Sequence, residues 1–114
     1  MTAGRVAYLC ADPGIPPDGS KGASVHFRAM AAALLRSGVD LDVFMTREGD
    51  ASVFAPHRAR VVPTPRARGV AGEVLQLGHS GALLEALAGA GPHVAVYERL
   101  SLFAAAGLAH ARAL

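Results

Sequence analysis

A short segment, Gly19-Ser20-Lys21-Gly22, combines residue types that can hold an anion. It follows an apolar run, residues 6–11, and precedes an alanine-rich stretch, residues 23–37, with the composition of a helix. The N–H groups at a helix N-terminus and the positive end of its dipole favour phosphate or carboxylate. Lys21 is the only lysine of the chain and would add a full charge there. This segment is therefore the first candidate for a binding site.

The glycine pattern narrows the ways in which this loop could bind phosphate. A dinucleotide fingerprint needs Gly-x-Gly-x-x-Gly, and the loop contains no Gly-x-Gly pair. A P-loop needs its lysine before the serine, but here the order is reversed, and Pro16 and Pro17 lack amides that would cradle a phosphate. Two interpretations stay open. The glycines serve only the backbone geometry of a strand-to-helix connection, or the loop is mobile and helps to close a cleft over a sugar nucleotide or an acceptor.

Three further polar side chains are candidates to line the same cleft. His26 lies one turn into the predicted helix, either partly exposed without a role or donating to a ligand oxygen. Glu98 and Arg99 follow an apolar run, residues 93–97, and the carboxyl ends of parallel strands line the ligand crevice of open α/β sheets. These two residues either pair with each other or with loop backbone, or they orient an acceptor or position the glycine loop. The other four histidines share no ligand spacing, and we expect no metal site.

The elements that would position these residues alternate between strand and helix. Apolar runs bounded by glycine and proline predict four strands, at residues 6–11, 39–45, 60–62 and 93–97. The first run is apolar on both faces, as in a central parallel strand covered by helices on each side. We therefore expect a partial Rossmann-like, three-layer α/β/α domain with a mainly parallel sheet of order 3-2-1-4 and right-handed crossovers.

Helical spacing predicts the connecting helices. For the first, Ser24 is a candidate N-cap, Gly38 a candidate left-handed residue after its end, and Arg28 and Arg36 can face solvent. Residues 70–90 are helical in pattern but interrupted by glycines, which predicts two short helices or a kinked one. A last helix is expected from residue 102, capped by Ser101.

Composition excludes several classes of protein. With 114 residues the chain is one domain or less, and 52% hydrophobic residues supply a core. The single cysteine, Cys10, excludes an internal disulfide, and we expect it to be a buried small hydrophobe. No apolar run approaches the ~20 residues of a membrane span, and the N-terminus has no signal-peptide pattern, so we expect a cytoplasmic protein.

Four arginines, at positions 58, 60, 66 and 68, form a local basic cluster around the predicted third strand. They have no interleaved aromatic residues, and nucleic-acid binding would need a denser basic stripe. We interpret them as a solvated loop, with a peripheral contact to acidic lipid head groups or a polyanionic acceptor as the alternative.

Three stretches, in this order, resemble the N-terminal half of GT-B glycosyltransferases of the retaining family 4. They are residues 5–38, with the small-residue loop and the pair Val25-His26 before a long alanine/leucine helix; residues 39–44; and residues 97–103, with the acidic–arginine pair Glu98-Arg99. The resemblance covers about residues 5–112 and is weakest between 50 and 91. The family often has adjacent glycines where this chain has Lys21-Gly22.

The resemblance implies a two-domain enzyme that moves a sugar from a nucleotide-sugar donor to an acceptor. Residues 1–114 would be an incomplete, acceptor-side N-terminal domain, inactive alone, because the C-terminal nucleotide-sugar domain is absent. Residues 19–22 would supply backbone amides and charge, while His26, Glu98 and Arg99 would line the cleft. The resemblance implies no metal or other cofactor, and no catalytic residue is identified.

The alternative is a non-enzymatic Rossmann-like module that binds a nucleotide or an anion. A receiver domain of this kind needs a phosphorylatable aspartate at the end of the third strand. The third strand here ends in Val62-Pro63-Thr64, which argues against a receiver.

Overall fold

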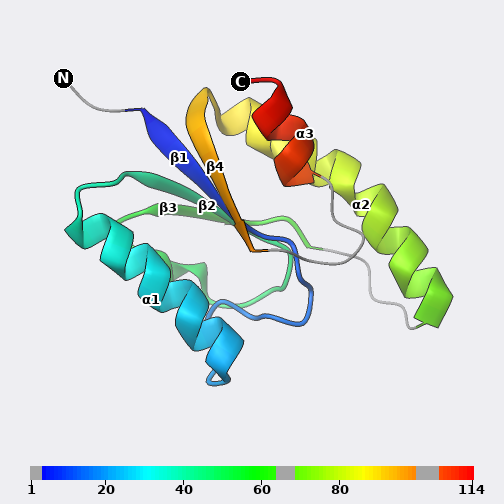
Figure 1. The fold of residues 1–114 in the computed structure, drawn as a ribbon. Helices are drawn as coiled ribbons and strands as arrows, with labels where there is room; N and C mark the ends of the chain where they lie inside the picture. Colours follow the sequence, from blue (N-terminus) through cyan, green and yellow to red (C-terminus); the bar gives the residue numbers. More distant parts are fainter. Residues whose placement is uncertain (1–3, 64–68, 100–105) are drawn as a thin grey trace.

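A computed structural model describes residues 4–63, 69–99 and 106–114 of the chain (Figure 1). A parallel sheet forms the centre, with α1 on one side and α2 and α3 on the other (Figure 1). The elements in chain order are β1 (Arg5–Cys10), α1 (Gly22–Arg36), β2 (Leu41–Met45), the short 3-10 helix η1 (Ala51–Phe54), β3 (Arg58–Val61), α2 (Gly69–Ala90), β4 (His93–Arg99) and α3 (Ala106–Arg112).

The four strands are all parallel and lie in the order β3-β2-β1-β4. This confirms the predicted strand order and the three-layer α/β architecture. Tyr8 of β1 pairs with Val43 on one side and with Tyr97 on the other, which places β1 at the centre. The last four residues of β1 are buried, because helices cover both faces of the sheet there.

Two apolar clusters fill the spaces on either side of the sheet. Under α1 and η1, the Phe27 ring packs edge-on against Tyr8, with centroids 5.1 Å apart. It also packs against Phe54 in a tilted arrangement, with centroids 4.7 Å apart. On the opposite face, Leu83 and Leu87 of α2 pack against β1 and β2, together with Ala106 of α3.

The two ends of α1 differ in how their backbone groups are satisfied. At the C-terminus, Gly38 has φ +81°, and the amides of Gly38 and Val39 donate to the carbonyls of Leu35 and Leu34. This confirms Gly38 as the left-handed residue after the helix. At the N-terminus the cap residue is Lys21, with no side-chain hydrogen bond. The prediction of Ser24 as the cap is wrong, because Ser24 lies inside the helix and is buried.

Helix α2 is continuous over 22 residues, so of the two predicted alternatives, two short helices or one kinked helix, the first is wrong. Each interior glycine costs about 1 kcal/mol of helix stability relative to alanine. Burial of a leucine contributes about 1.5–3 kcal/mol, and both Leu83 and Leu87 are buried against the sheet. Packing of the C-terminal half therefore offsets the glycines. Among the described residues, none of the helices is both long and apolar enough to span a bilayer.

Strand β4 continues two residues beyond the predicted end, so that Glu98 and Arg99 belong to the strand itself. The expected cap Ser101 and the start of the last helix lie outside the described residues, and α3 is described from Ala106.

Candidate functional site

The glycine segment lies at the carboxyl edge of the sheet and leads directly into α1. Ser20, Lys21 and Gly22 are exposed, while Gly19 is partly buried. No side chain caps α1. The Val25 amide donates to the Lys21 carbonyl at 3.0 Å, so the amides open to a ligand are those that precede Val25 in the helix. Such amides can donate to a phosphate or a carboxylate.

The loop is tied to α1 at its middle. Arg28 Nη1 donates to the carbonyl oxygens of Pro17, at 2.8 Å, and of Gly19, at 2.7 Å. Gly19 also packs closely, since a Cβ there would lie 2.6 Å from Ser24 Oγ. The expected solvent-facing position of Arg28 is therefore wrong, and this arginine holds the conformation of the loop. Sequence reasoning missed it because its acceptors are backbone carbonyls, which leave no signal in the sequence.

Replacing Arg28 with methionine is expected to lower the free energy of unfolding by about 1–2 kcal/mol. The variant keeps the aliphatic stem but loses two charge-assisted hydrogen bonds in a partly buried position. Urea unfolding followed by circular dichroism measures the change. Arg36→Met is the matched control, because Arg36 is exposed in the last turn of the same helix. Equal effects of the two substitutions would contradict the role assigned to Arg28.

His26 and Arg99 come together although 73 positions separate them in the sequence. Arg99 Nη1 donates to His26 Nδ1, which leaves the proton of the neutral ring on Nε2. The Nε of Arg99 is buried and has no acceptor among the described residues. A guanidinium with an unused donor, beside an uncapped helix, is suited to bind an anionic oxygen.

Tyr8 of the central strand β1 is fully buried and lies near Arg99. Burial raises the pKa of the Tyr8 phenol to about 12, although the neighbouring Arg99 charge opposes the shift. The phenol therefore stays neutral at physiological pH and donates to the carbonyl of Phe27 at 3.4 Å. It leaves the positive charge of Arg99 unneutralised.

Glu98 lies on the opposite face of β4 from Arg99, because successive strand residues point to opposite faces. Its carboxylate accepts from the backbone amide of Gly107 in α3. Burial raises the pKa of Glu98, and the Gly107 amide partly offsets this shift. The structure thus joins His26 with Arg99 but does not bring Glu98 to them, and the two neighbours do not pair with each other.

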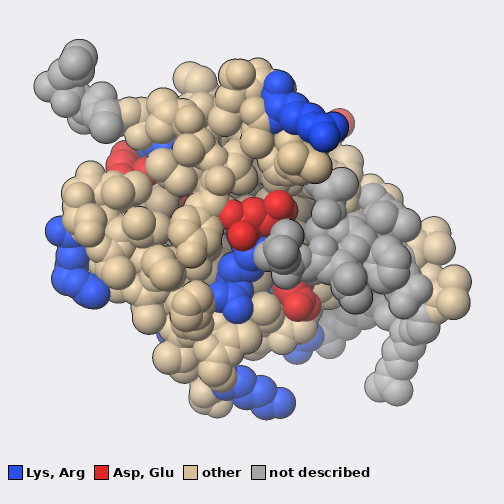
Figure 2. All heavy atoms as spheres, viewed as in Figure 1, with Lys and Arg blue, Asp and Glu red and all other residues tan. Residues whose placement is uncertain are grey.

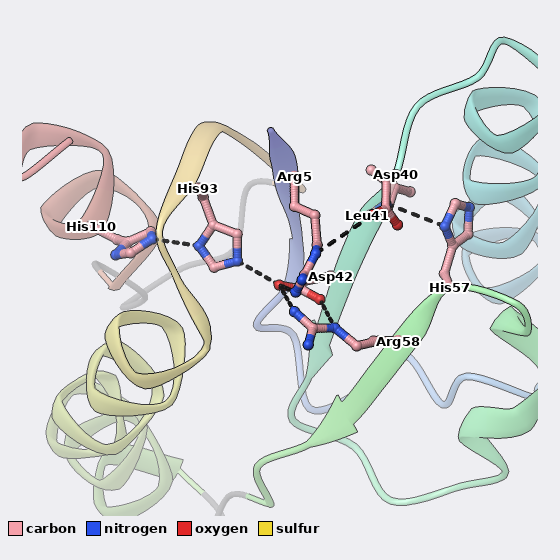
Figure 3. A network of polar contacts seen from close by, with 8 residues as sticks. All are labelled: Arg5, Asp40, Leu41, Asp42, His57, Arg58, His93 and His110. Atoms are coloured by element: carbon pink, nitrogen blue, oxygen red, sulfur yellow. Dashed lines mark hydrogen bonds and ion pairs between the residues drawn. The ribbon is translucent and has the colours of Figure 1, made fainter. Parts of the chain in front are cut away.

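A second polar cluster, which sequence reasoning missed, lies at the amino ends of the strands, on the edge opposite the glycine loop (Figure 3). Asp42 of β2 is 3% exposed. It accepts from Arg58 Nε at 2.7 Å and Nη2 at 3.0 Å and from His93 Nε2 at 2.8 Å, and Arg5 Nη1 lies 3.5 Å away. The only sequence signal was a carboxylate within an otherwise apolar strand, which requires buried partners.

The arginine cluster is divided by the structure. Arg60 lies on β3, as predicted, and Arg58 also belongs to this strand rather than to a loop. Positions 66 and 68 lie outside the described residues. Figure 2 shows acidic and basic side chains side by side near the centre of the visible face, with further basic side chains at separate places around it.

A half-open hollow of about 390 Å³ adjoins the same amino edge, away from the glycine loop. Asp42, Arg58 and Arg60 line it together with the C-terminal residues of α2. Because the C-terminal carbonyls of a helix carry partial negative charge and the arginines are positive, its walls favour no single ligand charge.

The described part of the chain contains neither a cluster of metal-ligating residues nor an exposed thiol. No group of three or more His, Cys, Asp or Glu residues there could hold a metal ion. Cys10 is free and buried, and burial raises the pKa of its thiol. The prediction that Cys10 is buried is confirmed.

The fold and the strand order define a partial Rossmann-like α/β domain. No protein-family model matches the chain, and comparisons with curated proteins and with solved structures find no match.

Proposed function

We propose that this chain is the acceptor-side, N-terminal domain of a GT-B-type glycosyltransferase, acting in the cytoplasm together with a second domain that holds the nucleotide. One observation carries the proposal. An uncapped helix follows residues 19–22, and one turn further along the same helix His26 meets Arg99, whose Nε lacks an acceptor among the described residues. The resemblance of the sequence to the family 4 glycosyltransferases supports sugar-nucleotide chemistry at this loop.

In this proposal, residues of the chain stabilise negative charge on the substrate and orient a hydrogen-bond donor toward it. The first-turn amides of α1 and Lys21 stabilise the negative charge that develops on a diphosphate as the sugar leaves. Arg99 fixes the His26 ring so that its Nε2–H can donate to an acceptor hydroxyl or to a phosphate oxygen. Glu98 lies on the other face of β4, and we give it no contact with substrate in this scheme.

The same observation supports a second candidate, a non-enzymatic module that binds a nucleotide or another anion. Both functions require an anion at the N-terminus of α1. Only the first requires a transfer of sugar.

Replacing Arg99 with glutamine is expected to weaken binding of pyrophosphate and of uridine diphosphate at least about tenfold, or about 1.4 kcal/mol. Glutamine keeps a hydrogen-bond donor but removes the charge. Amide NMR titration of the chain measures binding, and residues 20–25 are expected to shift most. Arg36→Gln, at the far end of α1, should bind as the wild type does. Equal binding by all three proteins would remove Arg99 from the site.

Transfer assays decide between the two candidates. The protein expressed from its full reading frame is incubated with labelled sugar nucleotides and an extract of lipid and glycan acceptors. Labelled product together with free nucleoside diphosphate supports the glycosyltransferase. Binding of pyrophosphate with no transfer from any donor would favour the anion-binding module.

A further inference from the structure

Helix α3 contacts the sheet through a line of three buried side chains (Figure 3). His110 of α3, His93 of β4 and Asp42 of β2 are 6%, 4% and 3% exposed. His93 Nδ1 lies 2.9 Å from His110 Nε2, and His93 Nε2 lies 2.8 Å from Asp42 Oδ2. Asp42 and His93 are 51 positions apart in the chain, and His93 and His110 are 17 positions apart.

The hydrogen-bond donors and acceptors of these three side chains limit how many protons the two imidazole rings can carry together. An ionised Asp42 only accepts, so His93 donates through Nε2. The contact between the two rings then needs one hydrogen, carried either by His110 Nε2 or by His93 Nδ1. One added proton on the pair is compatible with this contact, because one ring nitrogen can still accept. A second added proton places two N–H groups face to face and two positive charges side by side.

The surrounding charges do not relieve that repulsion. Arg5 of β1 and Arg58 of β3 both contact Asp42, so the carboxylate is already shared between two guanidiniums. Asp40, immediately before β2, contacts Arg5 and is largely exposed. The ring of Phe44 in β2 lies edge-on to the His93 ring, with centroids 6.2 Å apart, and carries no charge. Burial and the neighbouring His93 lower the pKa of His110, the direction that this geometry requires.

We propose that the His93–His110 pair is a proton-operated latch, which holds α3 on the sheet at neutral pH and releases it when both rings are protonated. Release of α3 also withdraws the Gly107 amide from Glu98, so acidification frees that carboxylate. The latch goes beyond the proposed glycosyltransferase function and does not depend on it.

The direction of the pH effect follows from proton linkage. The pKa of His110 is lower when α3 is docked than the ordinary histidine value of about 6.5. The docked state therefore binds fewer protons, and docking weakens as pH falls from about 6.5 through the docked-state pKa. Uptake of one proton changes the docking equilibrium by up to about tenfold per pH unit.

Hydrogen–deuterium exchange on the full chain tests the latch. Amide protection of α3, corrected for the intrinsic pH dependence of exchange, is expected to fall several-fold, and at most about tenfold, between pH 6.5 and 5.5. The amides of α1, which make no contact with the pair, are the internal reference and are expected to fall much less. Constant protection of α3 from pH 7.5 to 5 would overturn the proposal.

Matched variants separate the pair from other buried histidines. In His110→Gln, the amide Nε2 replaces the ring Nε2 as a donor but does not titrate, so protection of α3 should become independent of pH. His57 is the control, because it is also buried and both its ring nitrogens are engaged, with the Leu41 amide and the Ala31 carbonyl. His57→Gln should keep the pH response of α3. An equal response in all three proteins would contradict the latch.

An NMR titration of the wild-type imidazole signals keeps the proposal testable if His110→Gln loosens α3 at every pH. The His110 ring should then titrate over the same pH range in which the α3 amides lose protection. Titration of His110 without loss of protection would rule the latch out.

Discussion

Asp42→Asn is expected to lower the free energy of unfolding by about 2–4 kcal/mol at pH 7. The substitution keeps the size of the side chain but removes the charge that pairs with His93 and Arg58. The His93 side chain has no exposed surface, so water cannot take the place of the Asp42 carboxylate unless the surrounding side chains rearrange. The arginines are partly exposed, and their share is reduced by solvent screening. Most of the loss therefore comes from the buried contact with His93.

Asp40→Asn provides the matched control two positions earlier. Asp40 contacts the same Arg5, at 3.6 Å, but its side chain is 64% exposed. Exposed ion pairs contribute about 0–1 kcal/mol, and we expect a change in that range. Urea unfolding of both variants at low and moderate salt measures the difference. A loss below about 1 kcal/mol for Asp42→Asn would show that the network does not stabilise the fold.

The strand order could be predicted because its signals are local. Residues 6–11 are apolar on both faces, which only a central covered strand satisfies, and Gly38 marks the end of α1 without ambiguity. The glycine loop before α1 follows from the same pattern. These features require no knowledge of distant contacts, and the structure confirms the sheet order that they indicate.

The polar contacts could not be predicted, because each joins residues that are remote in sequence. His26 and Arg99 were separate candidates, and only the parallel pairing of β1 with β4 brings them together. The partners of Asp42 come from three other strands, and the pairing of the strands sets which side chains meet. Arg28 was placed on the solvent side of α1 because helical spacing does not reveal backbone acceptors in a neighbouring loop.

The two edges of the sheet therefore differ in how fully their polar groups are used. At the amino edge, Asp42 accepts from a histidine and from an arginine, with a second arginine close by. At the carboxyl edge, the first-turn amides of α1 are uncapped and Arg99 Nε has no described acceptor. Unused donors favour binding of an anion, and a satisfied network favours stability. This contrast is the physical basis of our proposal that an anion binds at the glycine loop.

Gly19→Ala is expected to weaken pyrophosphate binding at least about tenfold and to lower the free energy of unfolding by about 1–3 kcal/mol. The added methyl group would lie 2.6 Å from Ser24 Oγ and 2.8 Å from Pro16 Cγ. Ser24 is buried in α1 and cannot move aside freely, so the loop itself must shift. That shift displaces the carbonyl groups that Arg28 holds and changes the approach to the first-turn amides.

Gly22→Ala is the control within the same loop. A Cβ at Gly22 meets no atom within 4 Å, and the residue begins α1. Alanine there keeps the backbone amide and restricts the unfolded chain, so stability should rise by about 0.4–1 kcal/mol with binding unchanged. Isothermal titration with pyrophosphate and thermal unfolding measure both quantities. If Gly19→Ala bound pyrophosphate as tightly as Gly22→Ala, the conformation of this loop would have no part in anion binding.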